Sequence, residues 1–245
     1  PLAPAGPSVA VRSDRVLHDL IAWGPDLLRG TAVTVFLTFA SMTLALVFGL
    51  ILALGRLSAS RGFAIPAKVF VEIIRGSPLL LQLFYIFYVF PFFGIRFDRI
   101  EAGILGLAIN YGAYLSEVFR AGIQAVDHGQ WEAAFALGMR RGTTMRLVVF
   151  PQALRIVIPP VGNYFISLFK DTALVSTISI AELIFTGQLI AADTFKYLEV
   201  YTIIFVIYLA ISYPASVGVG LLETRLRPGG PHGAAVRVRA SGSQP

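Results

Sequence analysis

Charged residues are scarce in this sequence. Asp, Glu, Lys and Arg make up 14% of its 245 residues, whereas 56% are hydrophobic. A soluble domain usually carries about 25% charged residues, so this chain has too few to face water on all sides. In a lipid solvent every backbone N–H and C=O must be paired within the protein. The long apolar runs therefore predict membrane helices rather than the roughly ten-residue alternating strands of a barrel.

Several kinds of chemistry are excluded by residues that are missing. There is no cysteine, which rules out disulfides, thiolate metal sites and cysteine nucleophiles. The three histidines are His18, His128 and His232, and this scatter supports no metal site. No glycine is followed by lysine, so the chain has no G-x-x-x-x-G-K-[ST] phosphate loop. We expect no enzymatic activity, no catalytic residues and no cofactor bound to this chain.

The net charge of +6 has an explanation that does not involve nucleic acid. Lys and Arg collect in the cytoplasmic loops of membrane proteins. No basic and aromatic surface repeat accompanies the charge, as nucleic-acid binding would require. We expect the lipid bilayer, and not nucleic acid, to be the partner of this charge.

Five stretches are candidates to cross a bilayer, which requires roughly 20 apolar residues each. Three of them contain long uncharged runs, and the other two contain Glu117 and the pair Lys170 and Asp171. The sequence thus predicts an all-α membrane protein with five transmembrane helices and short cytoplasmic coupling helices. The predicted spans are 30–55, 66–93, 101–126, 156–183 and 200–222, in a domain at 27–222 between a polar tail at 1–26 and a disordered tail at 223–245.

An odd number of spans places the two termini on opposite sides of the membrane. If the N-terminus is outside and the C-terminus inside, more than twice as many Lys and Arg residues fall on the cytoplasmic side as on the outer side. The positive-inside rule favours this orientation.

The second predicted span is interrupted at Gly76-Ser77-Pro78. Serine is favoured at a helix N-cap and proline at the first helical position, so a new helix is expected to start here. Glu72 and Arg75 stand three residues apart before the break and could pair on one helix face. The interruption predicts either a kinked structural helix or a discontinuous helix beside a translocation path.

The polar loop at 127–151 has the pattern of a helix. Asp127 followed by Gln130 fits a capping box, and Gly142 would stop a helix that runs from about His128 to Arg141. An apolar stripe formed by Trp131, Ala134, Phe135 and Gly138 follows helical spacing. The segment is too short and too charged to span a bilayer. Its stripe must cover its own helical bundle, lie among lipid headgroups, or dock into a partner.

This loop resembles the EAA loop of ABC importer permeases. The resemblance rests on Glu132-Ala133-Ala134, on Gly138, and on Val148-x-Phe150-Pro151, at the family's spacing. Other segments resemble the branch that takes up polar amino acids of the His, Gln, Glu and Arg type. These segments are Arg75-Gly76-Ser77-Pro78-Leu79-Leu80, Ala113-Tyr114-x-x-Glu117-x-x-Arg120-Ala121-Gly122, Pro151-Gln152-Ala153-Leu154-Arg155 and Lys170-Asp171-Thr172-x-Leu174-Val175-Ser176.

The resemblance implies a set of partners in a bacterial inner membrane. These are a separate ATP-binding cassette ATPase that binds Mg-ATP, a second permease subunit, an external substrate-binding protein and an amino-acid substrate. The coupling helix that docks on the ATPase would consist of Glu132, Ala133, Ala134 and Gly138, with Trp131 and Phe135 as aromatic anchors.

Polar groups inside the spans are the candidates for the substrate pathway, because charges in a membrane are costly and usually functional. The candidates are Gln82, Asn110, Tyr111, Tyr114, Glu117, Lys170, Asp171 and Thr172. Neighbours on a helix point about 100° apart, so Lys170 and Asp171 need different partners. The bland alternative is that they pair structurally or snorkel to an interface.

A secondary transporter or channel for small polar solutes is the competing interpretation. It accounts for the spans and the intramembrane charges, but not for the capped helix with EAA spacing. The identity of the amino acid, and the choice between homodimer and heterodimer, stay open at this level.

Overall fold

A computed structural model describes residues 9–226, and within this part of the chain all regular secondary structure is helical. The α-helices are α1 (Val9–Arg56), α2 (Arg61–Arg75), α3 (Leu79–Phe84), α4 (Arg99–Gln124), α5 (His128–Ala136), α6 (Arg141–Thr144), α7 (Phe150–Asp171), α8 (Leu183–Thr194) and α9 (Tyr197–Leu226). Four short segments with π or 3-10 geometry join them: η1 (Tyr85–Val89), η2 (Phe90–Phe93), η3 (Met145–Val149) and η4 (Thr172–Ile178).

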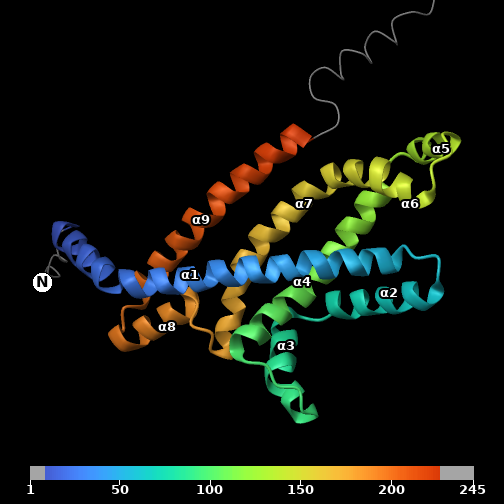
Figure 1. Cartoon of the computed structure of the whole chain (residues 1–245). Helices are drawn as coiled ribbons and strands as arrows, with labels where there is room; N and C mark the ends of the chain where they lie inside the picture. Colours follow the sequence, from blue (N-terminus) through green and yellow to red (C-terminus); the bar gives the residue numbers. More distant parts are fainter. Residues whose placement is uncertain (1–8, 227–245) are drawn as a thin grey trace, which may run out of the picture.

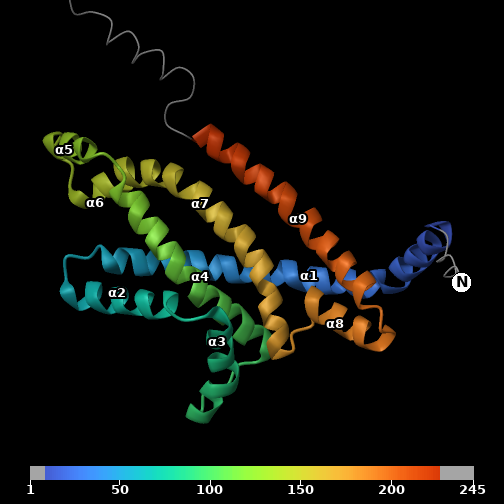
Figure 2. The same cartoon turned by 180° about the vertical axis from the view of Figure 1, so that it is seen from behind.

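The long helix α1 runs through the whole bundle (Figure 1). α2 returns along α1, and α4 and α7 cross it, while α9 packs on α7 and α8 (Figure 2). We call the two ends of the bundle the α5 end and the α8 end, after the short helix that lies at each. At the α5 end, α1 and α4 finish and α7 starts, close to α5 and α6; at the α8 end, α8 packs on the first half of α1.

Three helical stretches are long and apolar enough to cross a membrane: Ile21–Arg56, Arg141–Ile178 and Tyr197–Leu226. A fourth candidate is the pair Arg61–Arg75 and Leu79–Phe93, which is bent by 105°. The prediction of an all-helical membrane protein is confirmed, with three or four candidate spans among the described residues. The predicted count of five is not confirmed, because α4, although 26 residues long, is not among the stretches that are both long and apolar enough to cross a membrane.

The composition of α4 follows from its position. Half of its 26 residues are buried, and it packs against α1, α2, α3 and α7. Gly49 and Gly112 permit its close crossing with α1, since a Cβ on Gly49 would lie 3.0 Å from the Gly112 carbonyl oxygen. A helix surrounded by other helices needs less apolar surface than a helix surrounded by lipid, so α4 can carry polar side chains.

The first helix begins earlier than the predicted boundary at residue 26. α1 starts at Val9, and its early part is tied to the connection between α8 and α9. Lys196 Nζ donates to both carboxylate oxygens of Asp19 at 2.7 and 2.6 Å, and the Trp23 ring lies 5.5 Å from the same ammonium. Of the predicted tail at 223–245, residues 223–226 complete α9; 227–245 lie outside the described residues, as do 1–8.

The predicted break after α2 is present, but Ser77 does not cap the next helix. Pro78 is the N-cap of α3, and the Ser77 hydroxyl donates to the Ile74 carbonyl at 3.2 Å. Gln82 Nε2 also donates to that carbonyl, at 2.8 Å. These bonds satisfy the carbonyl end of α2 and thereby hold the bend.

The helix in the polar loop is shorter than predicted. Asp127 caps α5 by accepting from the Gly129 N–H at 2.7 Å, but no capping box forms because Gln130 accepts from Gln152 Nε2 instead. The helix ends at Ala136, not at Arg141. Gly138 adopts φ 77°, and its N–H donates to the Phe135 carbonyl, the left-handed ending that favours glycine.

Candidate functional site

A polar cavity of about 460 Å³ lies where the bend between α2 and α3 meets α4 and α7. Three segments distant in sequence supply its walls: the α2–α3 bend, the middle of α4 and the last two turns of α7. The lining residues are Arg75, Gly76, Ser77, Pro78, Leu79, Asn110, Tyr111, Tyr114, Tyr164, Ser167 and Asp171.

The carboxylate of this cavity comes from the last residue of α7. The Tyr111 hydroxyl donates to Asp171 Oδ2 at 2.6 Å, which joins α4 to α7. The ring of Tyr164 meets the ring of Tyr111 edge to face, with centroids 6.2 Å apart. The aromatic wall therefore orients the hydroxyl group that holds Asp171.

The cation of the cavity is Arg75, the last residue of α2. Its guanidinium carbon lies 5.2 Å from the centre of the Tyr114 ring, within the range of a cation–π contact. The predicted pairing of Arg75 with Glu72 is wrong, because Glu72 lies 3.8 Å from the Lys68 ammonium on the same helix. Arg75 is thus available to the cavity.

Gln82 holds the bend against α4. Asn110 Nδ2 donates to Gln82 Oε1 at 3.2 Å, while Gln82 Nε2 donates back to the end of α2. Of the predicted pathway residues, Asn110, Tyr111, Tyr114 and Asp171 line the cavity. Gln82 does not line it, but it forms a hydrogen bond with Asn110, which does.

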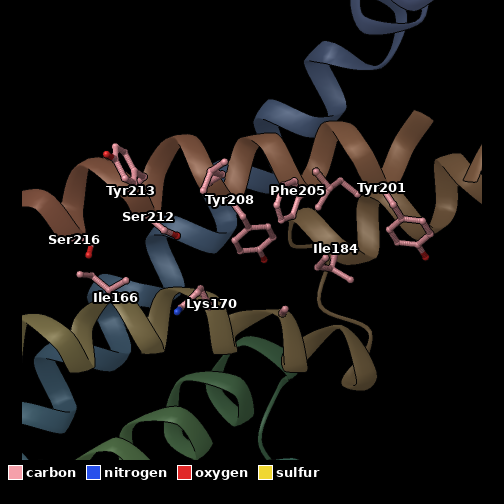
Figure 3. Close-up of a pocket in the computed structure, with 12 residues that line it drawn as sticks. Ile166, Lys170, Ile184, Tyr201, Phe205, Tyr208, Ser212, Tyr213 and Ser216 are labelled. Carbon is pink, nitrogen blue, oxygen red and sulfur yellow. The ribbon is translucent and has the colours of Figure 1, made fainter. Parts of the chain in front are cut away.

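Three predicted pathway residues lie elsewhere. Lys170 lies on α7 and lines an apolar crevice of about 570 Å³ between α7 and α9, whose other walls include Tyr208 and Ser212 of α9 (Figure 3). Thr172 is fully buried, and its hydroxyl donates to the Phe169 carbonyl at 2.7 Å. Glu117 is engaged in ion pairs with arginines. Lys170 and Asp171 indeed point to different surroundings, as their helical spacing predicted.

Sequence reasoning missed Arg75, Ser77, Tyr164 and Ser167 as cavity residues. Tyr164, Ser167 and Asp171 have the 3/4 spacing of one helix face, and that spacing could have revealed the face. Arg75 could not have been found in this way, because the 105° bend decides which way it points.

The second candidate surface is α5. Its stripe is divided: Ala134 is buried, and Trp131 packs on the cluster around Ile123 and Val149 in its own bundle. Phe135 is 47% exposed and Leu137, just after the helix, is 82% exposed.

The remaining members of the predicted coupling set, Glu132, Ala133 and Gly138, are also exposed. The face of α5 that looks away from the bundle is therefore an apolar and acidic one, and it is uncovered in this single chain.

Residues 27–228 match the family described as "Binding-protein-dependent transport system inner membrane component". The chain belongs to this family. It is a permease of the bacterial inner membrane. In this family of transporters, ATP is bound and hydrolysed by a separate ATPase subunit. Family membership decides against the secondary transporter or channel, and it confirms the family that the EAA loop predicted.

The relatives of the permease include several amino-acid permeases. The "L-cystine transport system permease protein TcyB" of Bacillus subtilis is 41% identical over 82% of this chain and 87% of its own length. The "Probable amino-acid ABC transporter permease protein y4tG" of Sinorhizobium fredii has the same identity and coverage. The "Glutamine transport system permease protein GlnP" of Escherichia coli is 36% identical over 83% of this chain and 94% of its own.

Solved structures share the architecture. A chain of the "Crystal structure of an amino acid ABC transporter with histidines" is 39% identical, with a TM-score of 0.80 over 84% of this permease and 97% of that chain. A chain of the MetNI methionine ABC transporter is 19% identical, with a TM-score of 0.71 over 84% and 99%, and it shows the fold alone.

Proposed function

We propose that this permease carries polar amino acids through the cavity between the α2–α3 bend, α4 and α7. The observation that supports this most directly is that the cavity presents both a guanidinium group, Arg75, and a carboxylate, Asp171. The relatives named for amino acids, glutamine and L-cystine agree with such a cargo.

The chemistry of the cargo fits these two groups. Every free amino acid carries a carboxylate and an ammonium group, and each loses hydration on leaving water. Arg75 can replace water around the carboxylate through several N–H donors, and Asp171 can accept from the ammonium group. Tyr111, Tyr114 and Asn110 add polar contacts without further charge.

We further propose that α5 docks on the ATPase through its outward face. Phe135 and Leu137 supply apolar area, Glu132 supplies charge, and Ala133 lets the surfaces approach closely. Trp131 and Ala134 have a different task, because they bind α5 to its own bundle and transmit its movement.

The proposed arrangement in the membrane places the α5 end in the cytoplasm and the α8 end outside. α4 then completes a set of five spans, with the N-terminus outside and the C-terminus inside. A second permease subunit would complete the pathway, and the external binding protein would deliver substrate at the α8 end. These partners are the ones a binding-protein-dependent system requires.

The cavity is tested by transport into vesicles that contain the complete complex and receive its binding protein. For Asp171→Asn we expect the KM for the amino acid to rise about tenfold or more, since losing a charged hydrogen bond costs roughly 1.5–3 kcal/mol. Lys170→Ala is the matched control, because Lys170 is the neighbour of Asp171 on α7 but faces the separate α7–α9 crevice. An unchanged KM for Asp171→Asn, or an equal rise for Lys170→Ala, would contradict the assignment of the cavity.

A further inference from the structure

Glu117 joins two helices at the α5 end of the bundle. Arg56, the last residue of α1, donates from Nη1 to Glu117 Oε2 of α4 at 2.5 Å. The two side chains are 13% and 30% exposed. An ion pair with so little solvent contact is screened less by salt than a surface pair.

A second arginine shares the same carboxylate. Arg120 stands three residues after Glu117 on α4, and its guanidinium donates to both oxygens of Glu117. Breaking a buried ion pair is normally costly because it leaves one charge uncompensated. Here Arg120 would still compensate Glu117 if Arg56 moved away. Arg56, at the end of its helix, could turn to water, so this contact can open at low cost.

The same cluster leads to α5. Arg120 also donates to Gln124, the last residue of α4, and Gln124 lines a cavity of about 510 Å³ together with Trp131. The segment Ala125–Asp127 alone separates α4 from α5. On the other side of the ion pair, Leu57, the residue directly after α1, packs against the same cluster as Trp131. Both helices that the Arg56–Glu117 ion pair joins, α1 and α4, are thus connected through a few residues to α5.

We propose that Arg56, Glu117 and Arg120 form an ion-pair latch between α1 and α4. Arg56 binds Glu117 in one state of the transport cycle and releases it in another, while Arg120 keeps the carboxylate neutralised. The latch translates a displacement of α5 into a movement of the end of α1 relative to α4. This inference rests on the proposed docking of α5, and the three residues position helices without contacting the substrate.

The first test exchanges the charges in the complete complex with its ATPase and binding protein in vesicles. Arg56→Glu sets two carboxylates against each other, and we expect amino acid transported per ATP to fall about tenfold, within the range of roughly 5–150-fold typical of linked sites. The triple variant Arg56→Glu, Glu117→Arg and Arg120→Glu inverts all three charges and again places one central charge between two opposite ones, and it should return to within about twofold of the unaltered ratio.

A matched control exchanges the charges of Asp26 and Arg29, an exposed pair on α1 with side chains 59% and 82% exposed. This exchange should leave the ratio unchanged, because exposed pairs contribute little. Failure of the triple variant at positions 56, 117 and 120 to rescue a correctly assembled complex would overturn the latch.

The second test measures the movement itself. Because the chain has no cysteine, Ala59→Cys after α1 and Ala121→Cys on α4 can be spin-labelled selectively. We expect the distance between the labels to differ between the nucleotide-free and the vanadate-trapped complex. The difference should be lost in Arg56→Glu and restored in the triple variant.

A distance that is identical in the two nucleotide states of the unaltered complex would refute the latch. Transport by the unaltered permease is measured in the same vesicles, so failure of the latch and failure of the proposed function give different results.

Discussion

Gly138 adopts a left-handed backbone conformation at the point where α5 ends. The sequence drew attention to this glycine through the EAA spacing. The structure adds a backbone reason. Its φ of 77° lies where side chains are disfavoured, and a Cβ placed on it would meet nothing within 4 Å. The restriction in the isolated chain is therefore conformational and not steric.

For Gly138→Leu we expect normal insertion of the permease but poor coupling of ATP hydrolysis to transport. Forcing a side chain into the left-handed region costs roughly 1–2 kcal/mol, enough to unwind the end of α5 and displace Leu137. Transport and ATP hydrolysis by the complete complex would be measured together.

Gly142→Leu is the matched control for this substitution. Gly142 is in α6 of the same loop, has no positive φ, and also has open space around it. Normal coupling in Gly138→Leu, or an equal defect in both variants, would show that the backbone conformation of Gly138 is unimportant.

At the scale of helices, the crossing of α1 and α4 depends on missing side chains. Gly49 faces the backbone of Gly112 and Ser116 as well as the side chain of Leu115. Sequence reasoning attached no meaning to Gly49, because a single glycine in a long apolar run says nothing about the partner it faces. The close contact with α4 is visible only once both helices are in place.

Gly49→Ala is expected to destabilise the permease by about 1–3 kcal/mol, the usual cost of overpacking. The added Cβ would lie 2.9–3.2 Å from its nearest neighbours, two of which are backbone atoms that cannot rotate away. Thermal unfolding of the purified complex in detergent would report the change.

Gly24→Ala on the same helix provides the comparison. A Cβ added at Gly24 would meet no atom within 4 Å, and alanine favours a helix by up to about 1 kcal/mol over glycine. The melting temperature of this variant should stay the same or rise. Equal stability of the two variants would argue against the close crossing.

At the scale of the whole molecule, the proposed topology makes the two ends of the bundle accessible from opposite sides. Single cysteines can report this, since the chain has none of its own. We expect a membrane-impermeant thiol reagent to label Arg96→Cys from outside intact cells. Ala136→Cys on α5 should react only after the membrane is opened. Both residues are exposed in this chain.

Ala59→Cys, in the loop between α1 and α2, is a second marker for the cytoplasmic side and should behave like the α5 position. Labelling of the α5 position from outside the cell would reverse the topology and remove the docking surface for the ATPase. Labelling of residue 96 only in opened membranes would contradict the count of five spans.

The sequence by itself determined that the protein lies in a membrane, that it is helical, and to which family it belongs. Composition excludes a water-soluble surface, and the spacing of Glu132, Ala133, Ala134 and Gly138 needs no tertiary information to be read. It also showed that Lys170 and Asp171 must face different surroundings, because that follows from the geometry of a single helix.

Only the tertiary structure decided which polar groups meet. Asp171 with Tyr111, and Glu117 with Arg56, are each about 60 residues apart in sequence, and they come together because α1, α4 and α7 cross. Arg75 faces the cavity because the chain bends by 105° after α2. One face of α5 points away from the bundle because Trp131 on its other side packs against the bundle. Periodicity fixes which residues share a face of one helix, whereas the crossing of helices fixes what that face touches.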